Sequence, residues 1–68
     1  MVGKTYKVKH KSHGEFEGRV VSFDEWEDWA LLEITKGIVE SGSGYVYAFT
    51  GDSMSFDLTL CDLEEVPS

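Results

Sequence analysis

A chain of 68 residues that contains a single cysteine, Cys61, can form neither an intrachain disulfide nor a cysteine-based zinc site. Its formal net charge of −7 opposes binding to a polyanion, since phosphate contacts normally draw on a basic surface. It has no run of 18 apolar residues and no apolar run of signal-peptide length near its start, so we expect one soluble, cytoplasmic domain.

The first predicted strand is basic and half-buried. In residues 5–11, Tyr6, Val8 and His10 alternate with lysines, which is the period of two that a strand shows when only one face is buried. After a short turn, residues 15–24 predict a second strand. Gly18 in its middle predicts a bend that lets the two ends bury different faces, as in the strands of a small barrel.

Positive charge is concentrated in this first strand. The first thirteen residues contain no acid, whereas residues 14–68 carry all thirteen carboxylates. Two interpretations remain open. The strand could pair electrostatically with acidic neighbours, or Lys7, Lys9 and Lys11 could face phosphate groups.

Three further strands complete the predicted sheet. Residues 29–34 are apolar on both faces and predict a central strand with Trp29 in the core; residues 35–44 predict a loop rich in glycine and serine. Residues 45–50 predict the fourth strand. Residues 54–60 predict the fifth, with four alternate residues facing the core, namely Met54, Phe56, Leu58 and Leu60. The pattern predicts an all-β, strongly bent, five-stranded antiparallel barrel.

The predicted barrel occupies nearly the whole chain. We expect one domain over residues 1–68, with its core at about 4–60 and a short C-terminal tail at 61–68. A chain this short buries only roughly 60% of the surface that its unfolded state exposes. With disulfides and cysteine-bound zinc excluded, oligomerisation is the expected source of further stability.

Two segments resemble the motifs of the Sm-like (LSm) RNA-binding proteins. EFEGRVVSFDEWEDWALLEI, residues 15–34, is similar to the Sm1 motif, with Asp28 where the family usually has Asn. AFTGDSMSFDL, residues 48–58, is similar to Sm2 in Gly51 and Asp52, with Thr50 where the family usually has Arg. The resemblance implies an Sm-like barrel, related to SH3-like barrels.

The resemblance also implies a closed homo-oligomeric ring. In Sm-like proteins the fourth strand of one subunit pairs with the fifth strand of the next, and here these would be residues 45–50 and 54–60. Both segments are apolar and nearly free of charge, and such strand edges would favour aggregation if they stayed unpaired.

The implied site binds single-stranded, U-rich RNA, or possibly DNA, at the pore of the ring. Trp26 would stack on a base, and Asp28 would accept hydrogen bonds from the base edge. Thr50, Gly51 and Asp52 would form the floor from the second pore loop. Lys7, Lys9 and Lys11 would be secondary phosphate contacts.

A second function is compatible with the same residues. An SH3-like or Tudor-like module could bind a cationic or methylated side chain in a cage. The cage would consist of Trp26, Tyr45 or Tyr47 and the acidic turn DEWED, residues 24–28. Trp26 could also simply cover the end of the barrel core.

No catalytic constellation and no cofactor motif is apparent in the sequence, so we expect a protein that is not an enzyme. No metal site is expected either. His10 and His13 are three residues apart, which on a strand would place them on opposite faces. The acidic turn lacks the spacing of a calcium loop.

Overall fold

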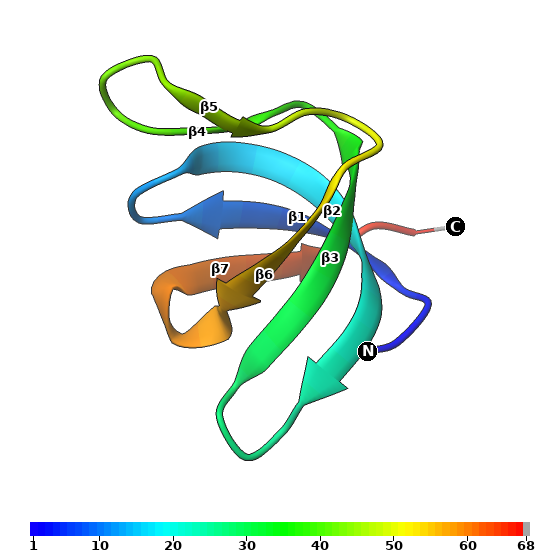
Figure 1. Ribbon diagram of the computed structural model, residues 1–68. Helices are drawn as coiled ribbons and strands as arrows, with labels where there is room; N and C mark the ends of the chain where they lie inside the picture. The colour runs from blue at the N-terminus through cyan, green and yellow to red at the C-terminus, as the bar shows by residue number, and fades with distance from the viewer. Residues whose placement is uncertain (68) are drawn as a thin grey trace.

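Antiparallel strands account for nearly all the regular structure in residues 1–67, which the computed structural model describes (Figure 1). The elements in chain order are β1 (Thr5–His10), β2 (Gly14–Asp24), β3 (Trp29–Lys36), β4 (Val39–Glu40), β5 (Val46–Ala48), β6 (Ser53–Asp57), the 3₁₀ turn η1 (Leu58–Leu60) and β7 (Cys61–Glu65). The prediction of an all-β, antiparallel fold is confirmed. In these residues no helix is long and apolar enough to cross a membrane.

The strands form one bent sheet and one small hairpin. The five-stranded sheet has the order β6-β3-β2-β1-β7, so β6 and β7 are its two edges. The hairpin β4–β5 is a separate two-stranded sheet that lies above the start of β2 in Figure 1. The loop between β2 and β3 projects from the opposite end of the molecule.

The first three predicted strands are confirmed, and so is the irregularity at Gly18. The pairing of β2 with β3 shifts register between Glu17 and Gly18, and β2 curves strongly in Figure 1. A Cβ atom at Gly18 would lie 3.3 Å from the Cβ atom of Leu32, so glycine permits the close approach of the two strands. The sequence also predicts that the end of β2 beyond the bend buries the opposite face, which carries Val21 and Phe23. This is wrong, because both side chains stay more than a third exposed.

The assignment of the last strands is wrong in two respects. Residues 45–50 do not form a long fourth strand of the main sheet, since β5 covers only 46–48 and pairs with β4. Residues 54–60 do not form one strand either. The Asp57 side chain accepts a hydrogen bond from the Thr59 amide and caps η1, which ends β6. The expected tail therefore contains β7, which pairs with β1.

The core lies between the bent sheet and the inner side of the hairpin. Its buried side chains come from β1 to β6, and they are Val8, Phe16, Val20, Ala30, Leu32, Ile34, Val39, Ala48 and Phe56. Phe56 is 2% exposed and its ring centroid lies 5.1 Å from that of Phe16. Trp29, expected in the core, is 43% exposed, and Leu60 also lies outside it.

The burial of Phe56 predicts a large mutational effect. Phe56→Ala should lower the free energy of unfolding by about 3–5 kcal/mol, which is comparable with the whole stability of so small a domain. Phe49 is 59% exposed, so Phe49→Ala should change it by no more than about 0.5 kcal/mol. Urea unfolding followed by circular dichroism measures both. Equal effects of the two substitutions would contradict the core described here.

Candidate functional site

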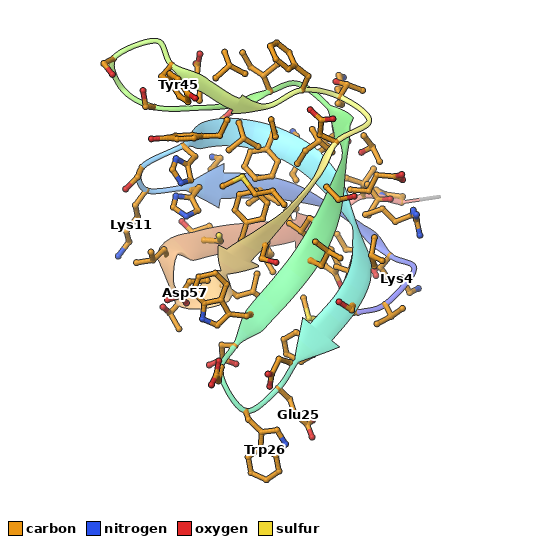
Figure 2. All side chains as sticks on the ribbon, in the orientation of Figure 1. Lys4, Lys11, Glu25, Trp26, Tyr45 and Asp57 are labelled. Carbon is orange, nitrogen blue, oxygen red and sulfur yellow. The ribbon has the colours of Figure 1, made fainter. Side chains whose placement is uncertain are left out.

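Trp26 is the most exposed large hydrophobic side chain of residues 1–67. It lies at the tip of the β2–β3 loop, is 91% exposed and points away from the body of the molecule in Figure 2. The interpretation of Trp26 as a cover for the core is therefore wrong. Its indole ring presents an apolar surface to solvent, which is a feature of ligand-contacting residues in a loop.

Hydrogen bonds define the backbone of this loop. The Oδ1 atom of Asp24 accepts from the Trp26 amide at 3.0 Å, which closes an Asx-type turn. Asp28 has a φ of 55°, in the left-handed region that Asp and Asn tolerate better than most residues. The Leu58 amide donates to the Asp28 carbonyl at 2.8 Å and fastens the loop to η1. The indole thus projects from an ordered support.

Acidic residues flank Trp26 in the sequence. Asp24, Glu25, Glu27 and Asp28 are within two residues of Trp26, and no lysine or arginine occurs between Arg19 and Lys36. Phe23, Asp24, Glu25 and Trp26 line a shallow hollow on the loop. An aromatic face beside several carboxylates attracts cations and repels phosphate groups.

A further carboxylate lies beyond the loop, at the start of η1. Asp57 accepts hydrogen bonds from the Thr59 hydroxyl at 2.6 Å and the Thr59 amide at 3.0 Å, and these bonds hold its pKa below the ordinary value. Asp57 pairs with Trp29 across β3 and β6, at the end of the ladder where the Trp26 loop begins. It therefore adds a stable negative charge to this end of the molecule.

The other half of the predicted RNA site lies elsewhere in the chain. Thr50, Gly51 and Asp52 form the turn before β6, and this turn bonds to Ile34 near the far end of β3. Trp26 precedes the opposite end of β3, and the ladder between them is roughly 17 Å long at the usual rise per residue. One chain therefore does not bring Trp26 and Asp28 together with these three residues.

The polar groups of that second turn are used within the chain. Thr50 donates its hydroxyl to the Gly37 carbonyl at 2.8 Å, and Asp52 accepts from the Phe49 amide at 2.9 Å. Gly51 has a φ of 98° and donates its amide to the Ile34 carbonyl at 2.8 Å, while the Ile34 amide donates to the Asp52 carbonyl at 2.8 Å. These internal hydrogen bonds explain why Thr50, Gly51 and Asp52 occupy this turn, and no ligand is needed to explain them. The 3₁₀ turn η1 does adjoin the Trp26 loop. Sequence patterning missed this turn because it assigned residues 54–60 to one long strand.

The lysines of β1 are flanked by acidic residues on both neighbouring strands. Lys7 lies opposite Glu17 on β2 and Glu64 on β7. Lys9 lies opposite Glu15 on β2 and Asp62 on β7. The Lys9 Nζ atom lies 3.8 Å from Glu15 Oε1. This arrangement favours the electrostatic interpretation of the basic strand over a phosphate-facing patch.

Lys11 differs from the other two lysines because no carboxylate lies opposite it on a neighbouring strand, although Lys7 also forms no ion pair within residues 1–67. Lys11 lies in the turn after β1 and is exposed, and no carboxylate of residues 1–67 forms an ion pair with it. It is labelled at the edge of the molecule in Figure 2, away from Trp26. A single exposed lysine does not make a basic patch.

The two tyrosines proposed for a cage with Trp26 belong to the hairpin. Tyr45 and Tyr47 are exposed, and their rings meet edge to face with centroids 5.0 Å apart. Figure 2 shows Tyr45 and Trp26 at opposite ends of the molecule. A cage built from Trp26 and either tyrosine does not form within one chain.

No cluster in residues 1–67 combines three potential metal ligands at binding distance. Burial raises the pKa of the Cys61 thiol to about 11, with the negative charges of Asp57 and Asp62 contributing. The thiol donates to the Asp57 carbonyl at 3.4 Å. It stays protonated at neutral pH and is therefore a poor nucleophile.

No family model, curated protein or solved structure matches this chain. The resemblance to Sm-like proteins thus stays an interpretation of the sequence. The function is therefore inferred from the chain's own residues, chiefly those of the Trp26 loop.

The backbone of this loop makes a prediction about Asp28. A β-branched residue is strained at its φ of 55°, so Asp28→Val should lower the free energy of unfolding by about 1–2 kcal/mol. Asp28→Asn is the matched control, because asparagine tolerates the same conformation and should leave stability nearly unchanged. Thermal unfolding of the two variants measures the difference. An unchanged midpoint in Asp28→Val would contradict the left-handed conformation.

Proposed function

We propose that this protein is a non-catalytic interaction module that binds a cationic segment of a protein partner with its Trp26 loop. One observation carries the proposal. An indole that is 91% exposed is held on an ordered loop whose other side chains are acidic. The module corresponds to the SH3-like or Tudor-like alternative, with Trp26 and carboxylates in place of a cage that includes the tyrosines.

The physical chemistry of the loop fits this ligand class. A lysine, arginine or methylated ammonium group placed over the indole face gains about 0.5–2 kcal/mol from the cation–π interaction. Asp24 and Glu25, which share the hollow with Trp26, would contribute the opposite charge. The same carboxylates would repel a phosphate group and so weaken its binding.

The proposal includes an architecture. We propose that the bent sheet is an SH3-like barrel of the kind that Sm-like proteins share, with η1 joining its last two strands. Among residues 1–67, β6 and β7 each have only one hydrogen-bonded neighbour in the sheet. Pairing of β6 in one subunit with β7 in the next would close a homo-oligomeric ring, in place of the expected pairing of 45–50 with 54–60.

Single-stranded RNA is the second candidate ligand, supported by the exposure of the indole itself. Base stacking needs only an exposed π-face, and each stacked base contributes about 1–3 kcal/mol in other proteins. Trp26 and Asp28 would remain the contacts in one chain. Thr50, Gly51 and Asp52 would have to come from a neighbouring subunit.

Binding assays with variants distinguish the two candidates. A hexa-arginine peptide should bind the wild-type protein, and Trp26→Ala should weaken binding by about 0.5–2 kcal/mol. Phe49→Ala removes an exposed aromatic ring elsewhere and should leave the affinity unchanged. Isothermal titration at low salt measures all three.

Two other results would redirect the proposal. Binding of oligouridine but not of the peptide, with loss in Trp26→Ala, would establish the RNA alternative. Binding of neither probe, or peptide binding that Trp26→Ala leaves intact, would reject the loop as the site.

The ring makes a separate prediction about mass. Light scattering should give a multiple of the 7.7 kDa chain mass for the wild type. Ser55→Lys adds a charge to the exposed side of edge strand β6 and should dissociate the assembly. Ser22→Lys adds the same charge to inner strand β2 and should not. A wild-type monomer at micromolar concentration would contradict the ring and leave the binding loop unaffected.

A further inference from the structure

Two imidazole rings are stacked beneath the β4–β5 hairpin. The centroids of His10 and His13 lie 4.2 Å apart with an interplanar angle of 28°. The expectation that they occupy opposite faces is wrong, because β1 ends at His10 and the following turn folds His13 back over it. His10 is only 9% exposed and is the one buried polar or charged side chain of residues 1–67.

Aromatic rings enclose the pair. Tyr47 of the hairpin meets His13 edge to face at 5.1 Å, and Phe56 of β6 lies 6.0 Å from His10 and 6.5 Å from His13. The neighbouring backbone of β2 contributes Gly14, opposite His10. The environment is mostly apolar and offers an added proton little stabilisation.

The titratable groups that face the pair come from three other strands. Tyr47 comes from β5, Asp57 from β6 and Cys61 from β7, where Cys61 lies opposite His10. Asp57 is the only one of these that is negative at neutral pH, and its charge favours protonated His10. Burial and the neighbouring His13 oppose protonation more strongly, so the pKa of His10 lies below its ordinary value.

Hydrogen bonds also favour neutral rings. The Nδ1 atom of His10 accepts from the Ser12 amide at 3.0 Å, and a proton on that atom would turn the acceptor into a donor. The Nδ1 atom of His13 is buried without a hydrogen-bond partner in residues 1–67. A positive charge on either ring would also repel the same charge on the other, one stacking distance away.

The hairpin is attached to the main sheet through His13. The Glu40 amide of β4 donates to the His13 carbonyl at 3.4 Å, a long bond, and Tyr47 of β5 rests on the His13 ring. The inner ends of the hairpin are anchored separately, since Val39 and Ala48 are buried in the core. Displacement of His13 would therefore free the outer part of the hairpin and leave the core intact.

We propose that the stacked pair His10–His13 is a pH-sensitive latch that holds the outer part of the β4–β5 hairpin closed while both rings are neutral. Protonation separates the rings, breaks the Ser12 bond and withdraws the support of Tyr47. The exposed face of the hairpin carries Tyr45 and Tyr47, so opening the latch changes the largest aromatic surface outside the Trp26 loop. This latch does not depend on what Trp26 binds.

The direction of the pH dependence follows from the lowered pKa of His10. The stabilisation is fully present above the unfolded-state pKa of about 6.5 and is lost as the pH falls through the lower folded-state value. Carboxyl groups in model peptides titrate near pH 4, so a comparison between about pH 7.5 and about pH 5.5 emphasises the histidines. The chain contains no other histidine.

Amide hydrogen exchange tests the latch. Protection of the Glu40 and Ser41 amides, corrected for intrinsic rates, should fall between about pH 7.5 and about pH 5.5, whereas protection at Val8 in β1 should not. The variant His10→Asn/His13→Gln retains an acceptor for the Ser12 amide but cannot titrate. Its hairpin protection should be independent of pH over this range.

Three results would overturn the proposal. One is wild-type hairpin protection that does not change with pH, and another is the same change in the double variant. If that variant does not fold, NMR titration of the wild-type imidazoles remains decisive. A His10 pKa at or above the ordinary value of about 6.5 would show that the fold does not favour the neutral pair.

Discussion

Opposite charges face each other between β1 and the strands on either side of it, and this alternation favours the strand order of the central sheet. Lys7 and Lys9 lie between carboxylates of β2 on one side and β7 on the other. Each exposed ion pair contributes little alone. The alternation of charge nevertheless favours the order in which β1 lies between β2 and β7, because all three strands are strongly charged. In this order β7 is an edge strand, and the bond from the Leu58 amide to the Asp28 carbonyl holds η1 against the Trp26 loop.

The same pairing also bears on the proposed ligand. The main concentration of positive charge is balanced inside the sheet, so it adds little to any attraction for phosphate groups. The surplus carboxylates that remain include those next to Trp26. A cationic partner therefore meets a favourable field at the place where the chain exposes its largest apolar side chain.

The two turns proposed for RNA contact differ in how their polar groups are used. At Thr50 and Asp52 the side chains bond to the chain's own backbone, and the turn serves the junction between the hairpin and β6. At the Trp26 loop the bonds of Asp24 and Asp28 shape the backbone, while the indole contacts little of the protein. Only the second arrangement leaves a large side chain available to a partner.

Alternation and glycine placement were sufficient to predict β1, β2 and β3 and the bend at Gly18. They could not locate the end of β6, because MSFDLTL keeps its period of two through the point where Asp57 caps a 3₁₀ turn. They also missed β7, whose short acidic sequence forms a strand only beside the lysines of β1. In the candidate site, the sequence predicted Trp26 at an acidic turn but left open whether it faces solvent or covers the core.

The remaining features of the site required the folded chain. The separation of Trp26 from residues 50–52 depends on which segment follows β6, and the stacking of His13 on His10 depends on the turn between them. Both arise from contacts between residues that lie near turns, where a period of two ceases to apply. Sequence spacing alone therefore misplaced them.

The most direct test of the central claim is an NMR titration that follows the indole N–H signals of Trp26 and Trp29 while hexa-arginine is added. The chain has only these two tryptophans, and Trp29 serves as the internal reference. We predict a saturable shift of the Trp26 signal that exceeds that of Trp29 and weakens as salt is added. A Trp26 signal that stays unchanged while the peptide binds elsewhere, or that shifts only with oligouridine, would contradict a cation-binding loop.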